Sequence, residues 1–511
     1  MLFQSHAFMF GFLPLVLAGW LGLRLAKVPA KGLMLYLVGV SLYFYGSASL
    51  DFLALLAVLT IFNFLLGRRL HDHPGARLYW LGVAVNLGVL IHYKYSAFAV
   101  TNLNWALGGQ WPVPATILPL AISFFTFQKI GYLTDIRRGH VPRYGFLEFG
   151  LFVWFFPQLM AGPIVRHSEM IPQLERLDRR RLAPDLAIGF TLFAVGLAKK
   201  IFIADSAALY ADFVFDGGSG PAPRLIEAWI GAIAYALQIY FDFSGYTDMA
   251  IGLARLFGIR LPLNFFSPYQ STSIIEFWRR WHITLSRFLR DYLYVSLGGN
   301  RHGPGRRYAN LMVVMLLGGL WHGASWTFVI WGGLHGAYLV LNHAWRALFP
   351  AAAAAVSRRA SLAGWALTLL AVMVAWIPFR AADFDATLTL WRGMAGLNGL
   401  MLPGSLAGML GGMAGGHAEF GAVFTPFVAL AGRFPILMLP LGLVLAVAAP
   451  NPYRWMGRVE PALRFREAPA STLARLAAWR PNWLWAGLCL GVLVAVLLQN
   501  SPQVRFLYWQ F

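Results

Sequence analysis

Long apolar runs are the feature that most constrains the fold of this chain. Only 12% of its 511 residues are charged, and 59% are hydrophobic. A soluble protein carries about 25% charged residues, so this chain cannot cover a water-soluble surface of its size. Soluble enzymes, disordered chains and coiled coils are therefore excluded. We predict an all-α polytopic membrane protein, because helices satisfy their own backbone hydrogen bonds in lipid and the alternation of a membrane barrel is absent.

About ten segments have the length and apolar character of a membrane-crossing helix, which needs ~20 mostly apolar residues. They are Phe8 to Leu23, Gly32 to Tyr45, Phe52 to Leu66, Leu78 to Val100, Ile117 to Leu133, Leu186 to Ile203, Trp229 to Leu253, Leu362 to Phe379, Gly421 to Ala449 and Trp483 to Leu498. We expect roughly eight to twelve spans in one integral membrane domain covering residues 1–511.

The charge pattern indicates how the chain is oriented. The net charge is +20, and the basic residues lie in loops between apolar runs, which is the cytoplasmic excess of a membrane protein rather than a nucleic-acid surface. The first cations follow the first apolar run, the reverse of a secretory signal peptide. We therefore expect an uncleaved first span with the N-terminus outside.

Two apolar segments, Phe146 to Val165 and Asn310 to Leu341, lie between basic loops and break the alternation of sides. Such a segment must enter the membrane and return, and re-entrant backbone is tolerated only where protein or a cavity surrounds it. Two short spans fit the second segment equally well. Lys199 and Lys200 fall late in a predicted span, which indicates either a half-membrane helix or a polar cavity.

His322 lies near the middle of the second of these segments, in Leu316–Trp326. A neutral imidazole is cheaper to bury than an imidazolium, and a neutral histidine can accept a proton from a hydroxyl as a general base. The neighbouring Gly318, Gly319 and Gly323 allow backbone or substrate to approach closely. A purely structural hydrogen-bonding role fits the histidine about equally well.

His282 belongs to a predicted amphipathic helix. Ser273 and Glu276 form a capping-box pattern, and apolar residues recur at helical spacing from Ile274 to Tyr292. His282 falls on or near the apolar face. The alternative is a helix at the membrane interface whose arginines snorkel to the headgroups. That alternative explains the arginines on the other faces, but it explains a histidine that points inward less well.

Residues 255–307 hold nine arginines and two acids, a balance of +7. Cytoplasmic bias with anionic lipid headgroups explains this excess. A cradle for a phosphorylated donor is the sharper alternative, because arginine pairs with phosphate bidentately. If the donor cradle is correct, we expect Arg279, Arg280, Asn264 and Trp278 to contact the donor.

Other polar residues have structural explanations. The motif Phe241 to Asp248 places four polar groups at the end of a span, which favours a packed polar network. The single cysteine, Cys489, is read as a small packing residue. The histidines at 282, 322, 335 and 343 lack the spacing of a metal motif such as HExxH, and we expect no metal.

Four motifs in order resemble the membrane-bound O-acyltransferase family, and above all its bacterial branch that acetylates exported polysaccharides. They are Phe241-Asp-Phe-Ser-Gly-Tyr246, Glu276-Phe-Trp-Arg-Arg-Trp-His282, Leu297-Gly-Gly-Asn-Arg301 and Gly319-Leu-Trp-His-Gly323. The resemblance is strongest from Leu118 to Asn342, which marks the expected acyltransferase core.

The resemblance implies that His322 is the catalytic histidine and His282 the second signature histidine. It also implies cytoplasmic acetyl-CoA as acyl donor, a location in the bacterial inner membrane, and a periplasmic partner that receives the acetyl group or passes it to the polysaccharide. Alginate, cellulose, another exopolysaccharide and peptidoglycan all remain open as final acceptors. A transporter or flippase for a polymer precursor is the rival reading, since the same spans and re-entrant segments suit it. A structural subunit of an export complex is a third and weaker interpretation.

Overall fold

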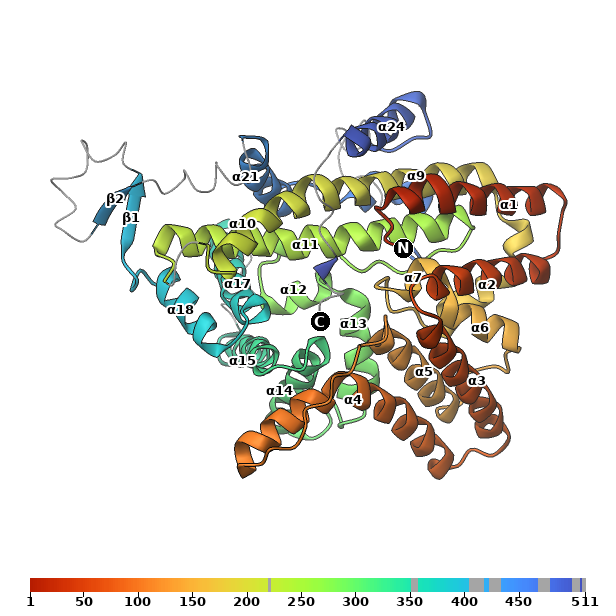
Figure 1. The fold of residues 1–511 in the computed structure, drawn as a ribbon, viewed down its shortest axis with the longest axis horizontal. Coiled ribbons are helices and arrows are strands. Elements are labelled where there is room, and N and C mark those ends of the chain that lie inside the picture. The colour runs from red at the N-terminus through yellow and green to blue at the C-terminus, as the bar shows by residue number, and fades with distance from the viewer. Residues whose placement is uncertain are drawn as a thin grey trace. The chain divides into compact units, whose positions relative to one another are not determined.

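The computed structural model describes residues 1–218, 222–350, 357–403, 418–421, 433–466, 478–498 and 506–507. These residues form helices almost throughout (Figure 1). Within the described part, the strands are one parallel pair, β1 (Leu400–Pro403) and β2 (Ala418–Gly421). The predicted all-α polytopic class is therefore confirmed, and the chain is a multi-pass membrane protein.

Five described helices are long and apolar enough to cross a membrane, together with two shorter apolar helices. The five are Ala7–Leu25, Leu50–Asp72, Ala76–Leu107, Leu182–Phe215 and Arg358–Arg380; the shorter two are Leu437–Val447 and Trp483–Leu498. Other predicted spans differ in detail. Helix α5 begins at Ile122 rather than at residue 117, and α2 (Ala30–Gly46) has 17 residues. Part of the predicted span from Gly421 lies outside the described residues.

The chain divides into two compact units that interleave along the sequence. Unit 1 comprises Met1–Leu197, Tyr246–Asn264 and Pro452–Asn500, and unit 2 comprises Ala198–Gly245, Phe265–Asn451 and Ser501–Phe511. The predicted acyltransferase core contributes residues to both.

Unit 1 is built mainly from the N-terminal helices and two later segments. Its helices are η1 (Ala7–Phe12), α1 (Leu13–Leu25), α2, α3 (Leu50–Asp72), α4 (Ala76–Leu107), α5 (Ile122–Arg137), α6 (Phe146–Trp154), α7 (Phe156–Leu159), α8 (His167–Leu174), η2 (Leu177–Arg179), α9 (Leu182–Ala198), α22 (Pro452–Trp455), η7 (Gly457–Val459) and α24 (Trp483–Leu498). Aromatic rings form much of its core: Phe44 packs against Phe12 and Phe156.

The first predicted re-entrant segment is a broken, buried helix in unit 1. Helix α6 ends at Trp154, the backbone turns at Phe155, and α7 continues for four residues. Residues 149–164 are all buried. The break in the helix is therefore surrounded by protein, which is the condition under which a re-entrant segment is tolerated.

Unit 2 contains every histidine that the sequence analysis considered for chemistry. Its elements are η3 (Lys199–Ala204), α10 (Asp205–Phe215), the first part of α11 (Leu225–Leu256), η4 (Pro268–Gln270), α12 (Ile274–Arg280), α13 (Ile283–Phe288), η5 (Leu289–Tyr294), α14 (Gly303–His322), α15 (Trp326–Leu348), α17 (Arg358–Arg380), α18 (Phe384–Met394), β1, β2 and α21 (Arg433–Val447). Tyr269 organises this unit, since its hydroxyl donates to the Ala236 carbonyl and accepts from the Trp376 indole.

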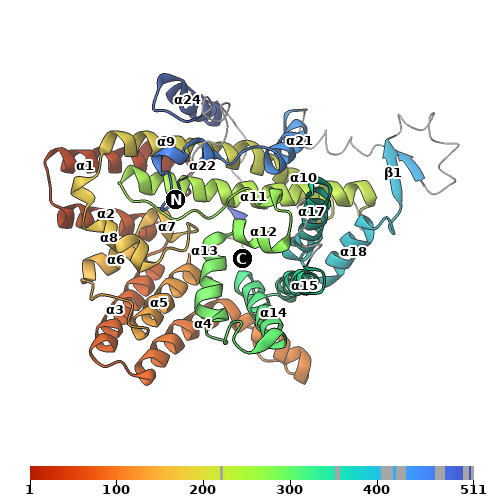
Figure 2. The ribbon, with the colours of Figure 1, turned by 180° about the vertical axis from the view of Figure 1, so that it is seen from behind.

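The second predicted re-entrant segment is a helical hairpin of α14 and α15, which lie side by side in both ribbon views (Figure 2). Glycines allow the two backbones to touch: a Cβ at Gly319 would overlap the Phe328 carbonyl oxygen, and one at Gly332 would overlap that of Met315. Gly323 faces the Phe328 ring as closely, whereas Gly318 has room for a Cβ. The predicted close approach therefore holds at Gly319 and Gly323.

Lys200 is a buried cation held by two carboxylates. Its Nζ lies 2.7 Å from Asp205 and 2.8 Å from Asp242, and its residue is 2% exposed. Asp242 also accepts the backbone N–H of Leu507 at 2.8 Å. The π-helix η3 at residues 199–204 places the lysine there. Of the two readings for these lysines, the structure supports a polar interior site for Lys200.

Candidate functional site

His322 is the last residue of α14, at the turn of the α14–α15 hairpin. It is 4% exposed and surrounded by aromatic rings. Its ring centroid lies 4.9 Å from Trp321, 5.1 Å from Trp331 and 5.2 Å from Phe379. The hairpin thus places the histidine among three aromatic rings, where little of its surface is exposed to solvent.

His282 interrupts the predicted amphipathic helix. Helix α12 ends at Arg280 and α13 starts at Ile283, so the single helix expected through Tyr292 is wrong. His282 has φ +41°, a left-handed conformation that non-glycine residues rarely adopt. Strain of this kind persists where surrounding structure imposes it, often at functional sites. The amphipathic pattern could not reveal the break, because the apolar stripe continues across it.

The break turns the His282 ring into the core of unit 2. Its residue is fully buried, and its ring meets Phe243 edge-on at 4.8 Å. It also contacts Trp321 at 6.4 Å, the same indole that packs against His322. The structure therefore brings the two predicted histidines together around Trp321.

The start of α12 agrees with the predicted capping box in part. The Ser273 side chain accepts the Glu276 backbone N–H at 3.3 Å. The Glu276 carboxylate, however, accepts from the Thr272 backbone rather than from Ser273. Although burial opposes ionisation, this bond and Arg280 hold the pKa of Glu276 below its ordinary value.

Arg279 and Arg280, both predicted to contact a donor, have different surroundings. Arg280 pairs with Glu276 at 2.6 Å, whereas Arg279 is exposed at the end of α12. Trp278 packs against Trp331 and His335. Asn264 belongs to unit 1, where it is buried, while the other three belong to unit 2.

Carboxylates neutralise many of the arginines that gave residues 255–307 their excess charge. Arg255 pairs with Asp185 and Arg260 with Glu460, both within unit 1. Arg290 pairs with Asp291. The net positive charge of this segment is therefore partly neutralised by carboxylates inside and outside it.

The sequence analysis considered His335 and His343 only as metal ligands. In the structure His335 is fully buried, and its ring centroid lies 4.8 Å from Trp331. Among the described residues, no three His, Cys, Asp or Glu side chains lie close enough to hold a metal ion. The spacing of seven residues from His335 to Asn342, two turns of helix, is the signal that could have drawn attention to this face of α15.

The predicted structural residues have partners that suit that role. Asp248 accepts the Tyr453 hydroxyl at 2.8 Å within unit 1, and Asp242 pairs with Lys200 in unit 2. Cys489 packs on Thr191, its sulfur 3.9 Å from the hydroxyl oxygen. These residues hold helices together.

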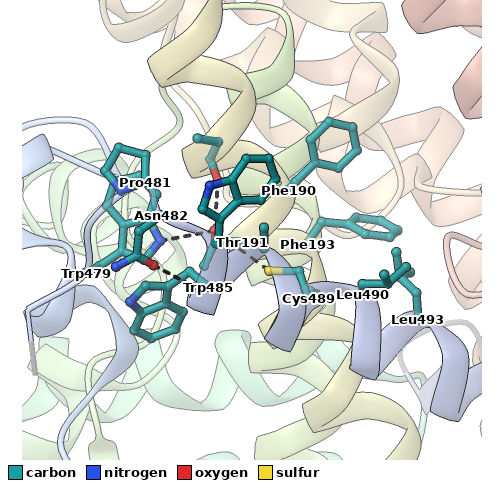
Figure 3. A pocket seen from close by; sticks show the side chains of 14 residues that line it. Phe190, Thr191, Phe193, Trp479, Pro481, Asn482, Trp485, Cys489, Leu490 and Leu493 are labelled. Atoms are coloured by element: carbon teal, nitrogen blue, oxygen red, sulfur yellow. Dashed lines mark hydrogen bonds between the residues drawn. The ribbon is translucent and has the colours of Figure 1, made fainter.

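An apolar groove of about 610 Å³ lies in unit 1 between α9 and α24 (Figure 3). Phe190, Phe193 and Leu490 line it, and Trp479 donates its indole N–H to Thr191 at its edge. None of the predicted site residues lines this groove.

Comparison with known proteins supplies the family. The model of the MBOAT, membrane-bound O-acyltransferase family matches residues 37–379. This chain belongs to the membrane-bound O-acyltransferase family. Its motifs at residues 241–246, 276–282, 297–301 and 319–323 all fall within the matched region.

Relatives within the membrane-bound O-acyltransferases have related activities. A peptidoglycan O-acetyltransferase of Helicobacter pylori is 41% identical over 435 residues, which cover 79% of this chain and 81% of the relative. A protein of Azotobacter vinelandii described as "Probable alginate O-acetylase AlgI" is 43% identical over 404 residues, covering 77% and 78%. A teichoic acid D-alanyltransferase of Streptococcus thermophilus is 30% identical over 240 residues, covering 44% and 57%. The chain is therefore an O-acyltransferase enzyme.

Proposed function

We propose that this enzyme transfers acetyl groups from cytoplasmic acetyl-CoA to an exported polysaccharide, directly or through a periplasmic partner protein, in the bacterial inner membrane. The observation that carries the proposal is His322 at the turn of the α14–α15 hairpin, buried among Trp321, Trp331 and Phe379. Relatives that acetylate peptidoglycan and alginate support acetyl as the transferred group.

His322 acts as the general base in this proposal. One ring nitrogen takes the proton of an acceptor hydroxyl while the hydroxyl oxygen attacks the thioester carbonyl carbon. The tetrahedral intermediate collapses by breaking the carbon–sulfur bond, and the thiolate recovers the proton from the imidazolium. Proton transfer by a positioned residue contributes about 10² to 10⁴-fold to such a rate.

His282 is the second residue of the proposed catalytic pair. Its strained backbone directs the ring toward Trp321, and the same indole also packs on His322. From that position it stabilises the negative oxygen of the tetrahedral intermediate or orients the reacting groups. Removing one such stabilising group costs about 10² to 10³-fold in kcat.

The donor binds on the basic side of unit 2. Arg279 is exposed, and the neighbouring Trp278 packs on the buried His335, which suits phosphate at one end and the thioester at the other. Arg280 belongs to the same proposal through its position beside Arg279, whereas donor binding by Asn264, a residue of unit 1, stays a prediction from the sequence. The donor carries the acyl group, and no metal is needed in this mechanism.

Acetylation of peptidoglycan is the second candidate within the same chemistry, favoured by the Helicobacter pylori relative. The immediate acceptor is then an amino-sugar hydroxyl rather than that of a uronic-acid or cellulose-like polymer. A polymer transporter without acyl transfer is the alternative from another class. It requires no thioester turnover and no special role for His322.

Full-length protein in lipid nanodiscs, radiolabelled acetyl-CoA and candidate acceptors provide the test. We expect wild type to release free CoA and label the acceptor, His322→Ala to lose at least about 10²-fold of the rate, and His140→Ala, an exposed loop histidine, to match wild type. Turnover by His322→Ala at the wild-type rate would overturn the catalytic assignment. Acceptor transport without thioester cleavage would overturn the acyltransfer proposal itself.

A further inference from the structure

Three neighbouring aromatic side chains, one on α12 and two on α15, carry four buried nitrogens without hydrogen-bond partners. The nitrogens are the Nε1 atoms of Trp278 and Trp331 and both ring nitrogens of His335. The three rings are mutual neighbours, with centroids 4.8 to 5.9 Å apart. We call these three residues the amide box. A buried polar group without a partner is destabilising by about 1–3 kcal/mol, so a group of them needs an explanation.

The amide box adjoins the proposed catalytic histidine. Trp331 contacts His335 on one side and His322 at 5.1 Å on the other. A ligand group bound at the box therefore lies one indole away from His322.

A polar face of α15 leads away from the box. Asn342 lies two turns beyond His335, and its buried Oδ1 also has no hydrogen-bond partner. Arg346 follows one turn later on the same face. From His335 to Arg346 the helix rises about 16 Å.

Three arginines gather at the far end of this face. Arg307 donates to His343 Nδ1 at 2.5 Å, and the charges of Arg279 and Arg346 also reach this imidazole. Within the described part of the chain, no carboxylate forms an ion pair with any of the three. We call Arg279, Arg307 and Arg346 the arginine end. Clustered guanidinium groups suit phosphate.

The chemistry of the box selects its ligand. Two indole N–H groups donate, and a neutral imidazole both donates and accepts. A secondary amide matches this set, since its carbonyl oxygen accepts from N–H groups and its N–H donates to an imidazole nitrogen. Secondary amides occur in the pantetheine arm of coenzyme A and in the N-acetyl group of an amino sugar.

The geometry points to a secondary-amide subsite at Trp278, Trp331 and His335 that binds the pantetheine arm of the donor, with Asn342 along its path and the phosphates at the arginine end. This inference rests on the proposed function and adds to it the residues that recognise the donor. The arginine end favours pantetheine over the amino sugar of a finished polysaccharide, because coenzyme A carries phosphates and that sugar carries none.

A series of acetyl thioesters tests the subsite with the full-length protein: acetyl-CoA, acetyl-pantetheine without the nucleotide, and S-acetyl butanethiol, which has no amide. We expect wild type to prefer acetyl-pantetheine over the amide-free thioester by tenfold or more in kcat/KM, and His335→Phe to reduce that ratio toward one. Phenylalanine keeps the ring and removes both nitrogens. Arg346→Gln should lower the ratio of acetyl-CoA to acetyl-pantetheine without changing the amide preference.

Matched controls and outcomes separate the two claims. Arg358→Gln, an exposed arginine of α17, should retain both wild-type ratios, and all variants should elute as the same species. An unchanged amide preference in His335→Phe overturns the subsite. A changed KM for an N-acetylated sugar acceptor, with donor ratios intact, also overturns it and assigns the box to the acceptor. Failure of wild type to cleave any thioester overturns the proposed function instead.

Discussion

Two buried polar clusters in unit 2 differ in how their polar atoms are satisfied. Lys200 is held by Asp205 and Asp242 through charged contacts of 2.7 and 2.8 Å. In the amide box, four nitrogens have no hydrogen-bond partner. An unpaired buried charge is far costlier than an unpaired neutral dipole, so a fold can leave only the second kind open for a ligand. The first cluster therefore stabilises the unit, and the second is available for binding.

Breaking the charged cluster should produce the largest effect. Lys200→Met leaves two carboxylates close together without their cation, and losing one partner of a buried pair is destabilising by about 3–5 kcal/mol. Thermal unfolding in nanodiscs measures this as a large fall in the midpoint. Arg290→Gln is the control, because its pair with Asp291 is exposed and such pairs contribute about 0–1 kcal/mol. Equal shifts in the two variants would contradict a stabilising role for Lys200.

Separating α14 from α15, the helix that carries Trp331 and His335, should have the next largest effect on stability. Gly332→Ala places a methyl group on the Met315 carbonyl oxygen, which should separate α15 from α14 and destabilise by about 1–3 kcal/mol. Gly333→Ala is the matched neighbour, since its Cβ would meet only the Leu316 side chain at 3.6 Å. It should be neutral or slightly stabilising, because alanine favours helix over glycine. If both alanines lower the midpoint equally, the close hairpin contact is not what matters.

Removing the two ring nitrogens of His335 should leave the protein as stable as wild type or stabilise it, unlike the two substitutions above. His335→Phe replaces an unsatisfied imidazole with an apolar ring. We expect the free energy of unfolding to stay unchanged or to rise by about 1–2 kcal/mol. Donor use should weaken in the same variant. Stability gained at the expense of activity is the usual mark of a binding residue. Thermal midpoints without donor supply the measurement, and a fall as large as that of Lys200→Met would place His335 among the structural residues.

The partly exposed Glu276–Arg280 pair should give the smallest effect. Because the folded pKa of Glu276 is lowered, its contribution exists above the unfolded pKa of about 4.3 and disappears as the pH falls through the folded value. Glu276→Gln should therefore destabilise by about 0.5 kcal/mol at neutral pH. The difference from wild type should vanish once the pH lies below the folded pKa of Glu276. A constant difference across the pH range would mean that packing, not charge, accounts for it.

The sequence predicted what depends on composition and local pattern. Apolar runs identified the membrane class, and the apolar context of His282 and His322 predicted their burial. The break at His282 could not be predicted, because tertiary packing imposes its left-handed backbone against an unbroken helical pattern. The Lys200–Asp242 pair joins residues 42 positions apart, which periodicity does not connect. His335 was misjudged because its significance lies in missing hydrogen bonds, and these are visible only once neighbours are placed.

Separating donor binding from chemistry tests the central claim most directly. Calorimetric titration of acetyl-CoA into His322→Gln, alongside a free-thiol assay on the same sample with acceptor present, measures both. The account predicts a Kd within about threefold of wild type together with a loss of at least about 10²-fold in thiol release. Release of CoA by His322→Gln at the wild-type rate would show that His322 is not the base, and would contradict the account.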